Sequence, residues 1–175
     1  AEAGTTLFVT HDQIEALTMG DRIGVLDRGQ ILQIGTPEDI YDRPATTFVA
    51  QLVGSPRINL VGANCVEKTL TVSESTVRFV LPEGDCLPDS FLLGVRPEDV
   101  RLVGEGGFAG EIVLTEPLGV ETIVNIMTGE QTLLSLAPGM TDVQVGDQVQ
   151  FDIIRDRLHF FDLDGLRVQL ESGNA

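Results

Sequence analysis

The spacing of apolar residues changes along the chain, and the first third mixes two periods. Residues 6–10 (TLFVT) form a short apolar run rich in β-branched and aromatic side chains, which predicts a strand. A helix is expected to begin near Asp12, with Ile14 and Leu17 on its apolar side and Gly20 as its stop. The N-terminal region is therefore predicted to contain both strands and helices.

Two short strands and two short helices are predicted next. Apolar and polar residues alternate in 22–26 and again in 31–34, which favours two strands joined by a turn. Thr36 is a suitable N-cap for a helix that ends before Pro44, and a further helix is expected within 46–54. These elements complete a small α/β unit, assigned to residues 1–55.

Helical spacing disappears after residues 55–59. Val149, Phe151 and Ile153 alternate with polar residues, as in a half-buried strand. Many short strands separated by Gly-rich turns are typical of a small barrel or sandwich, so residues 56–175 are predicted to form an all-β unit. The expected strands are 60–66, 76–81, 91–96, 109–115, 120–127, 131–136, 148–154 and 158–162.

Composition limits the partners of the chain. It has 175 residues, 42% of them hydrophobic, and a formal net charge of -16, which repels phosphate backbones and anionic lipid. Cys65 and Cys86 lack a CxxC spacing and are interpreted as idle thiols of a reducing compartment. No apolar run approaches the roughly 20 residues that span a bilayer. We therefore expect a soluble cytoplasmic protein that binds no nucleic acid.

The motifs of the chain resemble those of a known family. The segments VTHDQIEA, GQILQIGTPEDIY and FVAQLVGSPRINL, within residues 5–61, closely resemble the end of the nucleotide-binding domain of ABC-type importer ATPases for sugars, polyols and glycerol phosphate, the maltose type included. The later segments LLGVRPEDVRL, TEPLGVETIVNI and RLHFFD resemble the OB-fold-like regulatory domain of that family, called TOBE. The resemblance implies a C-terminal nucleotide-binding fragment in 1–55 and a TOBE domain in 56–175.

His11 is the candidate catalytic residue. By the resemblance it is the switch histidine, at the end of a strand, where its imidazole reaches the γ-phosphate of ATP. Phosphoryl transfer needs the γ-phosphate and its attacking water to be positioned, and imidazole can donate a hydrogen bond or relay a proton near neutral pH. From the residues alone, the alternative is a histidine that merely caps the following helix. Asp12 is interpreted as a helix cap.

The remaining parts of an ATP site are absent from the sequence. No G-x-x-x-x-G-K-[ST] loop occurs, and neither does a strand ending in Asp-Glu or a Ser-Gly-Gly signature. We therefore expect the 175-residue chain alone neither to bind ATP and Mg²⁺ tightly nor to hydrolyse ATP. Residues 1–35 are expected to be poorly ordered, rearranged or packed against another copy, because a short strand-helix piece buries too little apolar area alone.

The resemblance also implies partners. The parent protein would hydrolyse ATP as a homodimer bound to membrane permease subunits at the inner face of the cell membrane, driving import of a sugar or sugar-like solute. Its β domain would hold the two copies together and could receive a cytoplasmic regulatory protein. The alternative is a free-standing TOBE or OB-fold module that binds a small ligand or a regulatory protein without catalysis.

Arg96 and His159 are further residues for which the sequence suggests a position. Arg96, just after a strand, is expected in a turn where it pairs with a nearby carboxylate, or else in a regulatory dimer contact. His159 alternates with Leu158 and Phe160, which predicts a place on the solvent face. Related β modules of oxyanion importers bind molybdate-like anions, but the net charge disfavours an anion pocket here, and the acidic residues show no metal-ligand spacing.

Overall fold

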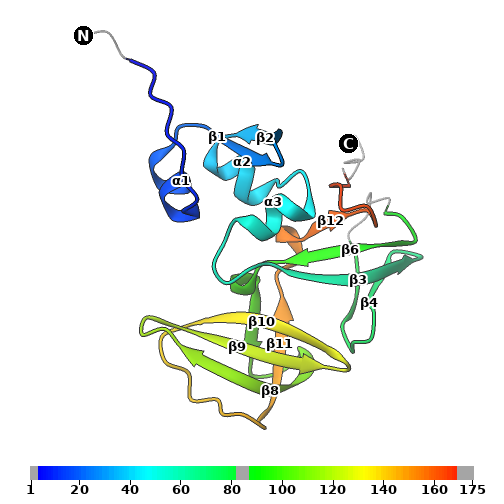
Figure 1. Ribbon diagram of the computed structural model, residues 1–175. Coiled ribbons are helices and arrows are strands. Elements are labelled where there is room, and N and C mark those ends of the chain that lie inside the picture. The colour runs from blue at the N-terminus through cyan, green and yellow to red at the C-terminus, as the bar shows by residue number, and fades with distance from the viewer. Residues whose placement is uncertain (1–3, 82–86, 169–175) are drawn as a thin grey trace.

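The computed structural model describes residues 4–81 and 87–168, and Cys86 lies outside them. An N-terminal helical unit sits at one end of a larger β region (Figure 1). Its helices and its one hairpin enclose a small core around Val25, Ile40 and Val49. The elements of this unit are α1 (Gln13–Met19), β1 (Ile23–Asp27), β2 (Gln30–Gly35), α2 (Pro37–Asp42) and α3 (Thr47–Leu52).

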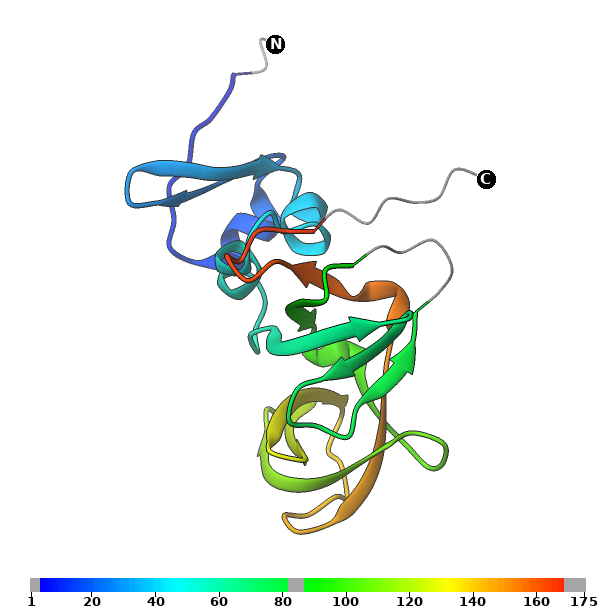
Figure 2. The ribbon, with the colours of Figure 1, turned by 90° about the vertical axis from the view of Figure 1, so that its right-hand side faces the viewer.

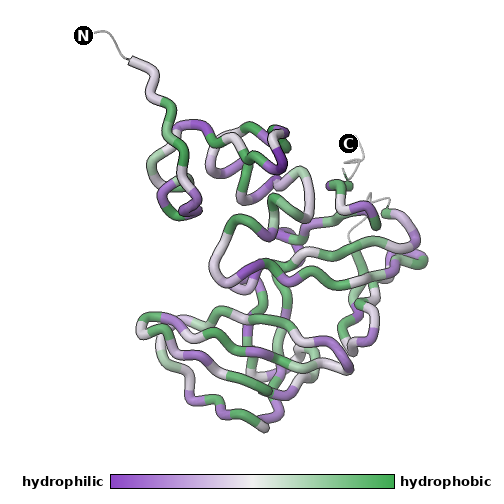
Figure 3. The backbone as a smooth tube through the Cα atoms, viewed as in Figure 1, coloured by the Kyte–Doolittle hydropathy of each residue, from purple (hydrophilic) through white to green (hydrophobic). Residues whose placement is uncertain are grey.

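The predicted strand 6–10 is not formed. Residues 4–10 have no strand partner and run away from the body of the molecule as an extended segment (Figures 1 and 3). Leu7 and Val9 are 91% and 86% exposed. An unpaired strand leaves its backbone groups and apolar side chains in water, so the sequence pattern needs a neighbouring strand that is not available here. The expectation that residues 1–35 lack their own structure does not hold for α1 and the antiparallel β1–β2 hairpin, which are formed. For the segment before α1 it stays a prediction.

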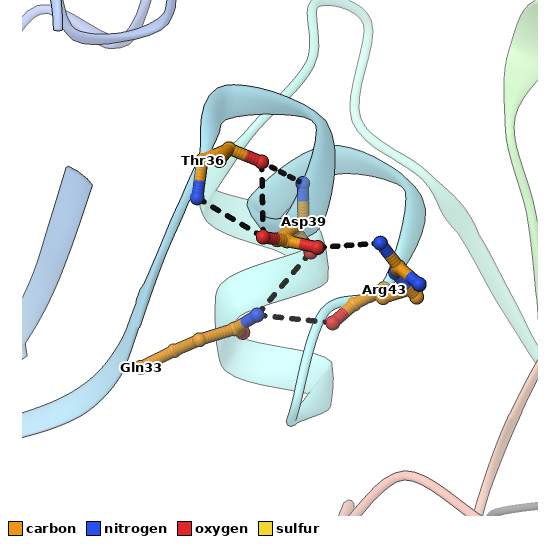
Figure 4. Close-up of polar contacts among 4 residues, drawn as sticks. All are labelled: Gln33, Thr36, Asp39 and Arg43. Atoms are coloured by element: carbon orange, nitrogen blue, oxygen red, sulfur yellow. Dashed lines mark hydrogen bonds and ion pairs between the residues drawn. The ribbon is translucent and has the colours of Figure 1, made fainter. Parts of the chain in front are cut away.

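Side chains define the ends of the short helices. The Asp12 carboxylate accepts hydrogen bonds from the backbone N–H groups of Ile14 and Glu15, so Asp12 is the predicted N-cap of α1. At α2, Thr36 and Asp39 form a reciprocal capping box (Figure 4). Thr36 donates to the Asp39 carboxylate from its backbone N–H, which holds the pKa of Asp39 below its usual value.

The β region consists of two five-stranded antiparallel sheets. Their strand orders are β10-β9-β8-β11-β7 and β12-β6-β3-β4-β5 (Figures 1 and 2). Short 3-10 turns at Pro97–Asp99 and Arg155–Arg157 carry the chain from one sheet to the other. The strands are β3 (Asn59–Val66), β4 (Thr69–Val72), β5 (Arg78–Val80), β6 (Ser90–Val95), β7 (Val100–Val103), β8 (Phe108–Pro117), β9 (Glu121–Thr128), β10 (Gln131–Pro138), β11 (Gln148–Ile153) and β12 (His159–Phe161).

One hydrophobic core joins the two sheets. Alternate residues of several strands point inward, as the burial pattern of β9 illustrates. The predicted fold class, a small α/β piece followed by an all-β OB-like domain, is confirmed. The sequence pattern missed β4 and β7, which have only four residues each. Fully buried core residues include Leu70, Phe91, Leu93, Ile112, Ile126 and Phe151.

The end of the described chain returns to the N-terminal unit. The backbone N–H of Thr47, at the start of α3, donates to the carbonyl of Gly165, and the N–H of Arg167 donates to the carbonyl of Ala45. The division at residue 55 therefore stays a prediction. Within the described residues, no helix has the length and apolar character needed to cross a bilayer.

Candidate functional site

His11 lies at a bend between the extended segment and α1. Its side chain is exposed. Because the carboxylate of Asp12 already caps α1, the reading of His11 as a mere helix cap does not hold. Its catalytic role stays a prediction.

The sequence and the described residues lack the main parts of an ATP site, and the inactivity of the chain alone stays a prediction. The sequence has no phosphate-binding loop, and its one lysine, Lys68, follows a glutamate in VEKT where such a loop needs glycine. Residues 4–10 beside His11 extend away from the protein body. No three His, Cys, Asp or Glu side chains gather as potential metal ligands in the part of the chain that the structure describes.

Arg96 forms the centre of the junction between the helical unit and the β region. Only 1% of Arg96 is exposed, although it follows β6 directly. Its Nη1 donates to the carbonyls of Ala50 and Val53, at 3.0 and 2.6 Å, and its Nη2 donates to the carbonyl of Tyr41 at 2.8 Å. These acceptors lie in the last turns of α2 and α3, where carbonyls lack helical partners and a cation is favoured.

The expected pairing of Arg96 with a carboxylate is therefore wrong. Among the described residues its hydrogen bonds all go to backbone carbonyls, and its Cζ lies 4.0 Å from the centroid of the Tyr41 ring. The Tyr41 hydroxyl donates to Glu98 on the β side of the junction. Burial and this hydrogen bond raise the pKa of Tyr41, so the phenol stays neutral. Two side chains, one from each unit, thus fix the helices on the β region.

His159 is also placed differently from the prediction. It is 5% exposed in β12, a three-residue strand buried throughout. The alternation argument failed because both faces of β12 are covered. Phe160 lies in the main core, and Phe161, which stacks with His159 on the other face, packs with Ala50 and Ile58. Burial, together with the charges of Arg96, Arg167 and Arg157, lowers the pKa of His159 to about 3.

A pocket of about 390 Å³ opens beside these residues. Arg96, His159 and Leu158 are buried, whereas Arg157 is exposed and ion-paired with buried Asp99 at 3.2 Å. Sequence reasoning named Arg96 and His159 but missed the arginines at 157 and 167. No local motif places them together, because the pocket forms only when the end of the chain returns to α2 and α3. The polar lining residues are Asp42, Arg96, Asp156, Arg157, His159 and Arg167.

Comparison with known proteins identifies the family to which this chain is related. Residues 93–161 match the TOBE domain family. The sn-glycerol-3-phosphate import ATP-binding protein UgpC of Psychromonas ingrahamii is 36% identical over 171 residues, which cover 93% of this chain and 45% of that protein. The chain is related to the C-terminal part of the ATP-binding subunits of ABC importers, and it contains a TOBE domain.

Other relatives of this family agree. The trehalose/maltose import ATP-binding protein MalK of Thermococcus litoralis is 36% identical, over 90% of this chain and 46% of that protein. The alpha-glucoside transport ATP-binding protein AglK of Rhizobium meliloti is 35% identical, over 92% of this chain and 47% of that protein. The chain spans about half the length of these relatives. The resemblance to importer subunits that the motifs indicated is confirmed.

Proposed function

We infer that this chain acts as the C-terminal portion of the ATP-hydrolysing subunit of an ABC importer. Within that subunit it would contribute His11 as the switch histidine and the TOBE domain as the regulatory and dimerisation part. The observation that carries the inference is the pairing, in one chain, of the TOBE match at 93–161 with a folded helical unit that leads back to His11. A free-standing β module would have no use for the helical unit or for the apolar segment before it.

The surface of the helical unit supports this assignment. α1 contains no buried residue, and one side of the β1–β2 hairpin presents apolar side chains to water. An exposed apolar patch of this kind usually marks a contact with more protein. We infer that the rest of a nucleotide-binding domain covers it. The exposed apolar residues are Leu7, Phe8, Val9, Ile14, Met19, Leu26, Ile31 and Ile34.

In the proposed subunit, ATP and Mg²⁺ would be held mainly by residues outside this sequence. His11 would add one imidazole, which can donate a hydrogen bond to a phosphate oxygen and orient the attacking water. The 175-residue chain alone would not hydrolyse ATP. Membrane permease subunits, a second copy of the subunit and a cytoplasmic regulatory protein are the proposed partners, at the inner face of the cell membrane. Because these relatives are named for the import or transport of glycerol phosphate, trehalose or maltose, and alpha-glucosides, a sugar or sugar-like solute is the proposed cargo.

The test uses the complete reading frame that contains this chain. Its product should include a phosphate-binding loop and an Asp-Glu strand end, and it should hydrolyse ATP when reconstituted with its permease. The His11→Ala variant should lower kcat by roughly 10²–10³, the size expected when one positioned donor is lost, while ATP binding is retained. Glu121→Gln, on an exposed position of β9, is the control and should keep full activity. A complete product without nucleotide-binding motifs would instead support a free-standing binding module.

A further inference from the structure

The pocket at the junction combines a buried floor with an open rim. Arg96 and His159, on its floor, are 1% and 5% exposed. Asp42, Asp156 and Arg157, on its rim, are exposed. The pocket volume of about 390 Å³ far exceeds the volume that one water molecule occupies in liquid water, about 30 Å³. It lies in the range of pockets that bind small ligands. The site is therefore large enough for a small metabolite.

Three arginines and two aspartates line the pocket, a local balance that differs from the net charge of -16 of the whole chain. Arg96, Arg157 and Arg167 all line the pocket, and all three disfavour a proton on His159. The two carboxylates that line it, Asp42 and Asp156, belong to the exposed rim. Net charge weighs every surface group equally, whereas a ligand responds to the groups that face it. The sequence-based argument against an anion pocket therefore does not apply to this place.

Arg167 is the least engaged arginine of the pocket. Both Nη atoms of Arg96 already donate to carbonyls and its Nε is buried, so Arg96 offers charge and no free donor. Arg167 has its Nη1 3.5 Å from Nδ1 of His159, which is a long contact for a guanidinium. Because a guanidinium only donates, Nδ1 is the acceptor and the imidazole proton is assigned to Nε2. A charge-assisted hydrogen bond to an oxyanion is shorter and stronger than this long contact, so Arg167 is the donor that such a ligand would engage.

We propose that this junction pocket binds a small oxyanion, a phosphate group either free or carried on a sugar. Arg167 would form charge-assisted hydrogen bonds to its oxygens, with Arg96 and the Asp99-paired Arg157 contributing charge. The rim carboxylates, Asp42 and Asp156, would accept hydrogen bonds from hydroxyl groups of an attached sugar. Since Asp42 belongs to the end of α2 and Arg157 to the β region, the ligand would link the two units. This proposal requires neither ATP nor the rest of an importer subunit.

The experiment is a calorimetric and NMR titration of the 175-residue chain near pH 7. Inorganic phosphate, glucose 6-phosphate and uncharged glucose are the three probes. We expect saturable one-to-one binding of a phosphate-bearing probe, with chemical-shift changes at His159, and none with glucose. Equal affinity for the two phosphates would identify free phosphate as the ligand, and tighter binding of the sugar phosphate would identify a phosphomonoester.

Variants locate the site. Arg167→Gln should weaken binding at least tenfold, the effect of losing one charge-assisted hydrogen bond, and Arg167→Lys should restore part of it. Arg78→Gln is the matched control, because Arg78 is an exposed arginine of β5 that does not line the pocket. Circular dichroism checks the fold, and if Arg167→Gln unfolds, the His159 shifts of the wild-type titration decide. No saturable binding of either phosphate, shifts away from His159, or equal losses in the Arg167 and Arg78 variants would overturn the proposal.

Discussion

The guanidinium of Arg96 stacks on the ring of Tyr41, with 4.0 Å between Cζ and the ring centroid, and donates to the backbone carbonyl of the same residue. The two residues are 55 positions apart and belong to different units of the fold. Stacking and carbonyl recognition by one planar group fix both the position and the rotation of α2 on the β region. Arg96 thereby adds a polar link to the apolar cluster of Ala50, Ile58 and Phe161 at this junction.

Arg96→Lys should destabilise the protein strongly. A lysine ammonium cannot stack in the same way while serving carbonyls of two helices, so buried acceptors would be left without donors. We expect a loss of about 2–3 kcal/mol in the free energy of unfolding, measured by urea denaturation. Arg101→Lys, at an exposed position of β7, is the control and should change stability by less than about 0.5 kcal/mol. Equal effects of the two variants would contradict this account of the junction.

Asn59 has a comparable role between the two β sheets. Its amide nitrogen donates to the carbonyls of Val95 and Leu134, and its Oδ1 accepts from the N–H of Leu134 at 2.7 Å. Asn59→Ala should cost about 2–3 kcal/mol, because backbone groups of Leu134 would remain buried and unpaired. Asn64→Ala removes only an exposed contact with Ser90 and should cost less than about 0.5 kcal/mol. Thermal unfolding of both variants is the measurement. A lower melting temperature for Asn59→Ala alone would show that the link between the sheets, and not the asparagine-to-alanine change itself, is responsible.

Local signals in the sequence predicted much of the fold. The caps at Asp12 and Thr36, and ten of the twelve described strands, follow from rules that involve only neighbouring residues. The junction could not be predicted in the same way. Arg96 and His159 are buried by segments far away in the chain, and alternation in a three-residue strand cannot tell whether another segment covers its outer face.

The strand predicted at 6–10 shows a second limit of prediction from local sequence. Its apolar, β-branched composition is a property of the residues, whereas a strand exists only where another backbone accepts its hydrogen bonds. In the structure no described residue pairs with it. The sequence thus specifies a segment that can form a strand in a larger sheet. In the proposed function, the rest of a nucleotide-binding domain would supply that sheet.

Gln33 couples the β1–β2 hairpin to α2. Its amide nitrogen donates to the carbonyls of Asp39 and Arg43 (Figure 4). Its Oε1 accepts from the N–H of Ala45 at 2.7 Å. Gln33→Ala should loosen this corner by about 1–2 kcal/mol, since each such bond contributes about 1 kcal/mol at most sites and some rearrange to water. Faster hydrogen exchange at the Ala45 amide is the direct readout. Gln148→Ala, which removes a surface contact in β11, should leave that amide unchanged.

The exposed segment around Phe8 should make the isolated chain self-associate. Leu7, Phe8 and Val9 are 91%, 62% and 86% exposed, and apolar side chains in an unpaired extended segment favour pairing with another copy. Light scattering after size-exclusion chromatography should show a mass that rises with concentration. Replacing the three residues by serine should shift the equilibrium toward the monomer. A matched triple replacement by serine of Glu2, Gly4 and Thr5 should leave the association unchanged, and a monomer at all concentrations for the wild type would contradict the prediction.

The stability of the protein should decrease in acid because of His159. Its pKa is about 3 in the folded protein, against an ordinary value of 6.5. Between these values the unfolded chain binds a proton that the folded chain does not, so this contribution is complete above pH 6.5 and is lost as the pH falls toward 3. The loss amounts to at most about 1.4 kcal/mol per pH unit.

His159→Gln removes the titrating group, so its free energy of unfolding should fall less steeply than that of the wild type over this pH range. Chemical denaturation at a series of pH values measures both slopes. Because the buried carboxyl of Asp99, whose pKa burial raises, is present in both proteins, its opposite contribution cancels in the comparison to first order. The control Gln148→Ala should follow the wild-type slope. Equal slopes for His159→Gln and the wild type would mean that the imidazole is already protonated in the fold, and the charge pattern inferred for the junction pocket would then need to be revised.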